Sequence, residues 1–279
     1  MNGNVDLEHH HFPSSGGAFP FHERLDPAIY IGGSRLRGDF GDSIHFGGTV
    51  LAVIGDHLGP TLSIAAFAMI IVIALGIPFG LLAGRFRGSL LDRFLMGSTF
   101  VGMSLPEFWV AMMLILGFSV HLGWFPVSGY IWPAESIPGW LAAIVLPSIA
   151  LAIDQLALVA RLVRDSVIST ARMPWVTSLR ARGLSDLSVV GLHQFKSAAV
   201  TSITVLGNSF AGFLTAAVVV EMVFNIPGFG WLTVQAALQR DYPLLQGAVL
   251  IAAAGYVLVN LVVDALYAVI DPRIRARGA

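Results

Sequence analysis

The chain has 279 residues, of which 56% are apolar and 12% are charged, whereas soluble globular domains have about 45–50% apolar and about 25% charged residues. This composition excludes an ordinary soluble domain. The 16 basic and 17 acidic side chains give a formal net charge of −1, so no excess of positive charge indicates a nucleic-acid partner. The chain has no cysteine, which excludes disulfides, thiolate metal sites and cysteine nucleophiles.

The first 60 residues differ from the rest of the chain. Residues 1–35 are an atypical polar segment, in which Asp6 and Glu8 stand where a signal peptide would have positive charge. The three adjacent histidines His9–His11 are interpreted as incidental, and no metal site is predicted. No stretch before residue 61 is apolar for long enough to span a membrane.

Five stretches in the remainder of the chain are candidate membrane spans. A hydrocarbon core about 30 Å thick needs about 20 mostly apolar residues in each helix. Three stretches have no Asp, Glu, Lys or Arg, and two more are nearly free of charge. They are Thr61–Ala83, Ala198–Val220 and Leu244–Val263, followed by Pro106–His121 and Leu141–Ala160. The sequence therefore predicts an all-α, polytopic membrane protein with five visible spans.

Pro106 determines how the second span begins, because proline suits the first turn of a helix and disrupts its interior. Two arrangements are compatible with the sequence. Either Leu91–Met103 lies along the membrane interface and the span starts at Ser104–Pro106, with Glu107 favoured by the helix dipole, or one long helix is kinked at this point. We favour the first arrangement.

Basic residues are sorted between alternate loops. The segments Arg85–Arg93, Arg161–Lys196 and Arg273–Arg277 hold twelve of the 16, whereas Leu122–Trp140 and Asn225–Pro243 hold only Arg240. The positive-inside rule therefore places the first three segments and the C-terminus in the cytoplasm. The other loops are rich in Trp and Tyr, which favour the headgroup region on the outer side.

Acidic residues in or beside spans are candidates for function, because charge is costly within a bilayer. Asp154 lies near the middle of its span, where it either lines a pore or forms hydrogen bonds between helices. Glu221 and Asp264 lie at span ends, where they could reach headgroup water, so a structural role is favoured for them. As a rival hypothesis, the three acids would form the relay of a proton-coupled secondary carrier.

The residues alone do not decide the role of two further features. Asn208, Gly212 and Ala216 recur every four residues and share one helix face, which is typical of plain helix packing, a pore wall or a dimer contact. The long basic loop at about residues 166–197 can hold a short helix, a glycine turn and a second helix. It either docks a partner or lies on anionic lipid. The chain has no G-x-x-x-x-G-K-[ST] motif for binding ATP.

The segment Leu179–Ser185 resembles the cytoplasmic EAA-type loop of ABC-transporter permeases, specifically those of the dipeptide, oligopeptide and nickel family. Further motifs of that family follow in the same order along the chain. They are Leu36–Ser43, Arg87–Arg93, Ser104–Trp109, Leu122–Gly129, Val219–Phe224 with Pro227–Gly230, Arg240–Pro243, and Asp264–Tyr267 with Asp271–Arg275. Each motif is weak alone, but their order makes the resemblance specific.

The resemblance implies a type I importer permease in a bacterial or archaeal plasma membrane. Residues 61–275 would form the transmembrane domain, 36–60 an extracytoplasmic stretch before it, and 276–279 a cytoplasmic tail. The partners would be a second permease, two ATPases that use ATP and Mg²⁺, and an extracytoplasmic solute-binding protein. The chain itself would bind no cofactor and would be a pore subunit rather than an enzyme.

The resemblance also implies which residues act. Coupling to an ATPase would involve Thr177, Leu179, Ala181, Arg182, Gly183, Leu184 and Ser185. Asp154, Asn208, Gly212 and Glu221 would line the translocation path or pack helices. The substrate class would be short peptides, with nickel chelates or other small solutes as alternatives. Family members usually have six spans, with one before the L-x-G-D-x-G motif, so we expect the native subunit to carry an apolar span ahead of Met1.

Overall fold

The computed structural model describes residues 40–185, 188–189 and 195–270. The predictions for residues 1–35 and 276–279 lie outside these residues. The helices, with η for a π-helix, are α1 (Val50–Ile71), η3 (Val72–Gly76), α2 (Ile77–Arg85), α3 (Leu90–Ser104), α4 (Glu107–Leu114), η4 (Ile115–His121), α5 (Ile137–Thr170), α6 (Pro174–Ala181), α8 (Phe195–Phe224), α9 (Phe229–Leu238) and α10 (Tyr242–Ile270). Among the described residues the only β pairing outside helices is a bridge between Asp42 and Thr49. The all-α prediction is confirmed.

Four continuous helical segments are long and apolar enough to cross a bilayer, and one bent helix pair could supply a fifth span. The continuous segments are Val50–Arg85, Ile137–Thr170, Val205–Phe224 and Tyr242–Val263. The first helix starts 11 residues before the predicted span, because the Thr49 side chain caps it by accepting a hydrogen bond from Ala52 N. The sequence did not indicate this early start, because Asp56 interrupts the charge-free stretch.

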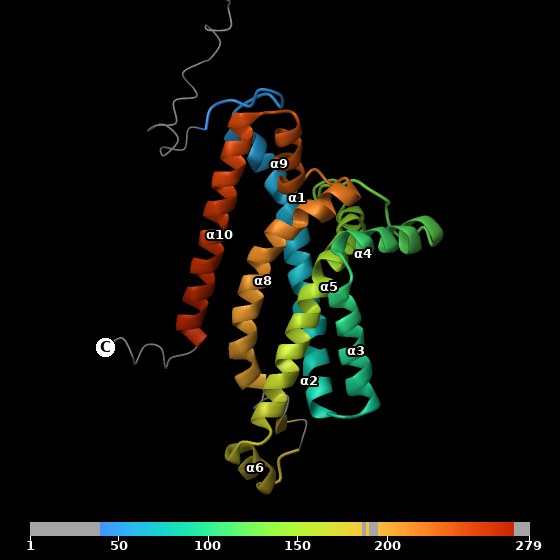
Figure 1. The fold of residues 1–279 in the computed structure, drawn as a ribbon, viewed down its shortest axis with the longest axis vertical. Helices are drawn as coiled ribbons and strands as arrows, with labels where there is room; N and C mark the ends of the chain where they lie inside the picture. The colour runs from blue at the N-terminus through green and yellow to red at the C-terminus, as the bar shows by residue number, and fades with distance from the viewer. Residues whose placement is uncertain (1–39, 186–187, 190–194, 271–279) are drawn as a thin grey trace, which may run out of the picture.

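The bent pair corrects the favoured arrangement around Pro106. Helix α4 does begin at Glu107, after Pro106 at its N-cap. However, α3 packs along α5 instead of lying apart from the bundle, and the α4–η4 segment turns away from α3 by 106°. Figure 1 shows α3 standing beside α5 and α2, with the following green segment projecting to the side. The break arises because proline cannot continue the hydrogen bonding of α3.

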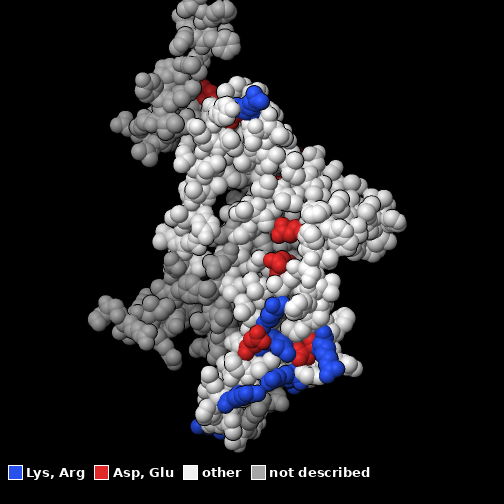
Figure 2. All heavy atoms as spheres, viewed as in Figure 1, with Lys and Arg blue, Asp and Glu red and all other residues white. Residues whose placement is uncertain are grey.

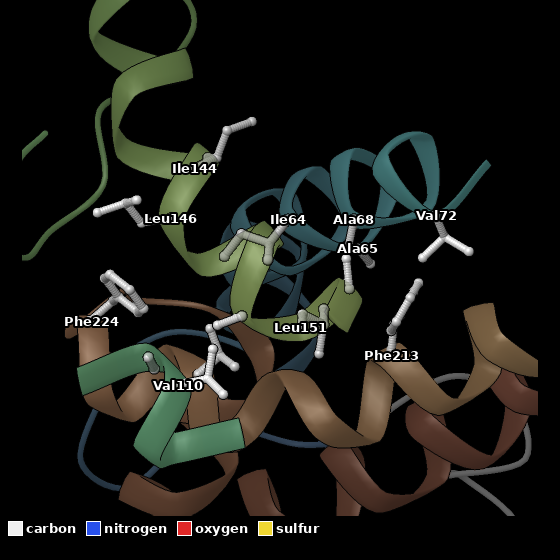
Figure 3. Close-up of a cluster of buried hydrophobic side chains, with 14 of the residues drawn as sticks. Ile64, Ala65, Ala68, Val72, Val110, Ile144, Leu146, Leu151, Phe213 and Phe224 are labelled. Carbon is white, nitrogen blue, oxygen red and sulfur yellow. The ribbon is translucent and has the colours of Figure 1, made fainter. Parts of the chain in front are cut away.

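Helix α5 is the centre of the bundle and packs against α1, α2, α3, α4 and α8 (Figure 1). The main core gathers around it from α1, α5 and α8 (Figure 3). Its fully or almost fully buried members include Ile64, Ala68, Val72, Ile144, Leu151 and Phe213. A second core lies between α1, α9 and α10, built on Ile54, Leu232 and Leu244. Helix α9 lies at one end of the bundle, and α6 lies at the opposite end (Figure 1).

The contact of α5 with η3 and α2 depends on glycine. Gly76, Gly80 and Gly84 recur every four residues on the face of η3 and α2 that meets α5. A Cβ atom at Gly80 would lie 2.5 Å from the carbonyl oxygen of Ala160, and one at Gly84 would lie 2.8 Å from the side chain of Val167. Small residues at this spacing let two spanning helices approach closely. This stripe was visible in the sequence but was not predicted to be a packing face.

Candidate functional site

The residues proposed from the sequence fall at three places in the fold. The expected coupling residues lie on and after α6, at one end of the bundle. Asp154 lies within α5, and Glu221 lies near the end of α8 that meets α9. The structure therefore does not bring these groups together into one site, and each is described in turn.

Helix α6 ends in a glycine turn that positions the expected coupling residues. Gly183 has φ +82°, a left-handed conformation that favours glycine. The backbone N–H of Leu184 donates to the carbonyl of Leu179 at 3.3 Å, which is the six-to-one hydrogen bond of a Schellman motif. Leu179 and Leu184 are half-buried on the two sides of this turn. The glycine turn expected from the sequence is therefore present.

The remaining coupling candidates present an open surface. Thr177, Ala181, Arg182, Gly183 and Ser185 are all exposed, whereas Val176 is fully buried. Figure 1 shows α6 beyond the ends of α2 and α5, where it caps the lower end of the molecule. The continuation of this loop through residues 186–187 and 190–194 lies outside the described residues. The exposed face of α6 is therefore free to contact another protein.

Asp154 takes part in a polar link between α5 and α8. The side-chain amide of Gln155 donates to Asp154 at 3.1 Å, and the Ser209 hydroxyl donates to Gln155 Oε1 at 2.6 Å. Glu107, the first residue of α4, lies near enough for its charge to interact with that of Asp154. The interhelical hydrogen bond involves Gln155 rather than Asp154 itself. The Asp154 side chain is half-buried, so its carboxylate is partly accessible from outside the bundle.

Glu221 has a clear structural task. Its side chain is fully buried, accepts a 2.5 Å hydrogen bond from the Thr61 hydroxyl and accepts another from the backbone N–H of Trp231 at 2.8 Å. Thr61 in turn accepts from the N–H of Phe229 at 2.8 Å. A carboxylate at the positive end of a helix satisfies its free N–H groups and is favoured by its dipole. Glu221 thus ties α1 and α8 to the start of α9.

The position of Glu221 corrects one expectation, because its side chain does not reach headgroup water in the described chain. The sequence could not show that α9 folds back onto the end of α8. Asn208 lies on α8, and its side chain lies outside the described part of the chain. Gly212 is exposed, and an added Cβ there would meet nothing within 4 Å. The close approach of α8 to α10 is made instead at Gly207, where a Cβ would lie 2.3 Å from Val263.

Asp241 is a buried acid whose importance sequence reasoning missed. It accepts hydrogen bonds from the Ser43 hydroxyl at 2.6 Å and from the backbone N–H groups of Ile44, His45 and Leu244 at 2.9, 3.1 and 3.2 Å. Burial acts to raise the pKa of Asp241, but these hydrogen bonds outweigh it and hold the pKa below its usual value. Ser43 and Asp241 both lie in motifs that resemble those of the family, and this resemblance was the sequence feature that could have pointed to them.

No group of three or more His, Cys, Asp or Glu side chains converges on a possible metal position within residues 40–185, 188–189 and 195–270. The features with functional potential are therefore an exposed helix with a glycine turn at one end, and charged side chains on α5 within an apolar bundle. Together with the candidate spans, they define a multi-pass membrane protein of the permease class.

Comparison with known proteins gives the family. Residues 76–276 match the model for the binding-protein-dependent transport system inner membrane component, and the chain belongs to this family. It is 37% identical to a probable peptide ABC transporter permease of Sinorhizobium fredii, over 86% of this chain and 77% of that protein. It is 34% identical to an oligopeptide transport system permease protein of Bacillus subtilis, over 87% of this chain and 78% of the relative. The chain is therefore an ABC importer permease subunit and an inner-membrane component.

Solved structures support the same fold. A methionine ABC transporter in an inward-facing conformation superposes with a TM-score of 0.65 at 15% identity, over 79% of this chain and 97% of the other. An amino acid ABC transporter has a TM-score of 0.54 at 19% identity, over 80% of this chain and 94% of the other. The predicted permease-like helical bundle is confirmed by these likenesses.

Proposed function

We propose that this chain is one permease of an ATP-driven importer that carries short peptides into the cytoplasm. The observation that carries the proposal is α6, a short helix with an exposed face and a glycine turn at one end of the spanning bundle. Such a surface suits docking into a groove of a separate ATPase subunit. Because the chain has no phosphate-binding loop, ATP and Mg²⁺ would be used by the partner subunits.

The subunit composition follows from the same proposal. Two ATPases, a second permease and an extracytoplasmic solute-binding protein would complete the transporter. Closure of the ATPase pair would move α6 and, through its direct connection to the end of α5, the central helix of the bundle. The α6 end and the C-terminus would lie in the cytoplasm, in keeping with the Lys and Arg side chains gathered toward that end in Figure 2.

Peptides are the proposed substrate because two relatives that span most of this chain are named peptide or oligopeptide permeases. Nickel uptake has less support, since the described residues offer no converging set of metal ligands. A proton-coupled carrier also has less support than an ATP-driven one. Glu221, one of its supposed relay acids, is held by Thr61 and by the N-terminus of α9.

The test is reconstitution of the chain with its partner subunits and binding protein in proteoliposomes. We expect ATP to drive uptake of labelled di- to pentapeptides, and a non-hydrolysable ATP analogue to abolish it. Uptake of labelled nickel without peptide uptake would overturn the substrate assignment. Peptide uptake that follows a pH gradient without ATP would overturn the ATP-driven mechanism and favour the carrier.

A further inference from the structure

Helix α5 has two opposite faces of different chemistry. Asp154, Arg161 and Asp165 are 7 and 4 residues apart, so at 3.6 residues per turn they point within about 20° of one direction. Val159, Val163 and Val167 lie about 140–220° away from Asp154 on the same helix. These valines are buried against the glycine stripe of η3 and α2. The packed face of α5 thus leaves a stripe of alternating negative and positive charge on the other side.

The charged stripe is accessible over its length. Asp154 and Arg161 are half-buried, and the side chain of Asp165 is 60% exposed. Figure 2 shows acidic and basic side chains in a column that runs from the middle of the molecule toward the end carrying α6, with a smaller charged group at the opposite end. Over the same stretch, the deeper charged pair formed by Asp92 and Arg164 is joined at 2.7 Å and ties α3 to α5. Arg164 also contacts Asp165 at 3.3 Å, so Asp165 joins this ion pair, whereas Asp154 and Arg161 have no ion pair within the described part of the chain.

Much of the charge on this row has no opposite charge beside it. Asp154 accepts a hydrogen bond from Gln155, and neither it nor Glu107 has an ion pair within the part of the chain that the structure describes. The guanidinium of Arg161 lies over the Phe100 ring at 5.0 Å and donates to Met103 Sδ at 3.4 Å. Its partners are thus aromatic and sulfur atoms of α3, which leave its positive charge uncompensated.

Three surroundings could receive this face in a membrane. Lipid is disfavoured, because Asp154 lies near the middle of α5, where a charged side chain is costly in a bilayer. A dry protein contact would have to bury Asp154 beside Glu107, two carboxylates that repel each other, and unpaired buried charge is strongly destabilising. Water satisfies all the charged groups without a matching partner. The arrangement therefore favours an aqueous passage along this face.

We propose that the face of α5 bearing Asp154, Arg161 and Asp165, together with Glu107 of α4, lines the translocation path and holds both charged termini of a peptide in transit. This inference rests on the proposed function, because it assigns a site for the substrate of the same importer. Asp154 and Glu107 receive the ammonium group, and Arg161 receives the carboxylate.

The spacing of the charges suits a short peptide. Asp154 and Arg161 are seven positions apart on the helix, which corresponds to a rise of about 10 Å. About three extended residues cover the same distance. A tripeptide can therefore place its ammonium group at the acidic pair while its carboxylate meets the guanidinium. Charge-assisted hydrogen bonds are the strong kind and would favour zwitterionic peptides over apolar solutes of similar size.

The first test measures water access, and the absence of native cysteine makes it direct. Leu158→Cys places a thiol on the charged face of α5 without removing a charge, and Leu261→Cys on an apolar, exposed part of α10 is the matched control. In the reconstituted complex, a charged methanethiosulfonate should label position 158 about 50-fold or more faster than the control, because a charged reagent is excluded from lipid. Equal, slow labelling at both positions would overturn the proposal and indicate a dry contact.

The second test asks whether the path holds peptide. Trialanine, delivered with binding protein and ATP, should slow labelling of Leu158→Cys but not of Leu261→Cys, and adding Asp154→Asn should remove this protection. Asp154→Asn and Arg161→Gln should each lower trialanine uptake about tenfold through loss of one charged contact. Asp56→Asn, an exposed acid on α1, should leave uptake unchanged.

The proposed function and the peptide-holding role of α5 can be contradicted by different results. If the unaltered complex takes up no trialanine, the proposed function itself is wrong. If the unaltered complex takes up trialanine, and both charge variants transport it at the normal rate with no protection at position 158, the proposed function stands and the peptide-holding role of α5 is wrong.

Discussion

The hydroxyl of Ser43 donates a 2.6 Å hydrogen bond to Oδ2 of Asp241, across 198 positions of sequence. The same carboxylate accepts the N–H of Leu244 in the first turn of α10. Asp241 therefore caps the last spanning helix and fixes the stretch that precedes the first one. Because the Asp241 side chain is fully buried, this contact joins the stretch before α1 to the start of α10 without help from solvent.

Removing the Ser43 hydroxyl should lower the stability of the contact between the stretch before α1 and the start of α10. In Ser43→Ala, Asp241 loses one of its donors and the N–H of Phe46 loses its acceptor. We expect the free energy of unfolding to fall by about 1–3 kcal/mol, because a buried charged acceptor is left under-satisfied. Thermal unfolding in detergent would measure the change. Ser104→Ala, an exposed serine bonded only within α3, is the control, and an equal loss of stability in both variants would contradict the role of Asp241.

The lowered pKa of Asp241 predicts how this contact depends on pH. A carboxyl whose pKa is lower in the folded state contributes stability that is fully present above its unfolded pKa, near the usual value of 3.8. That stability is lost as the pH falls through the lower, folded-state pKa. Unfolding midpoints of the normal chain and of Asp241→Asn, measured from pH 7 down to pH 3, should therefore converge at the acid end. A constant difference would show that ionisation of Asp241 does not contribute.

The sequence was sufficient to locate the four continuous candidate spans, because a bilayer requires long apolar helices and such helices contain few charged residues. Spacing was less informative for contacts. The stripe at Gly212 and the stripe at Gly80 have the same four-residue repeat, but a Cβ would meet another helix closely at Gly80 and would meet nothing within 4 Å at Gly212. A repeat shows which residues share a face, whereas the partner of that face depends on tertiary folding. For the same reason the sequence did not reveal that Glu221 holds the start of α9.

Gly228 gives a sharp test of the Glu221 contact. A Cβ at this position would lie 2.3 Å from the Glu221 carboxyl carbon, so Gly228→Ala must displace either the carboxylate or the start of α9. We expect a loss of about 2 kcal/mol or more, comparable to breaking a buried polar network. Gly255→Ala in α10, where a Cβ meets nothing within 4 Å, should be neutral or stabilising, since alanine favours helix more than glycine does. Similar unfolding midpoints for both variants would contradict this account.

The glycine turn after α6 predicts a selective loss of coupling. Gly183→Val places a β-branched residue at φ +82°, where valine is strained. Gly183→Asn is the matched control, because asparagine tolerates left-handed backbone far better. We expect the valine variant to insert normally but to lose most of the substrate-stimulated ATPase activity of the assembled complex. The asparagine variant should keep most of it. Full stimulation in the valine variant would count against coupling through this turn.

The orientation of the bundle is the prediction on which the coupling role depends. Basic residues concentrate in three alternate loop and tail segments of the sequence, and α6 lies at the end opposite to α9 (Figure 1). The positive-inside rule then places the α6 end in the cytoplasm and the loop that contains Ser128 outside. In whole cells, an impermeant thiol reagent should label Ser128→Cys directly and Ser185→Cys only after permeabilisation. Both side chains are exposed in the folded chain, so burial would not explain a failure to react. The reverse labelling pattern would place α6 outside, beyond the reach of any cytoplasmic ATPase, and would overturn the coupling assignment together with the topology.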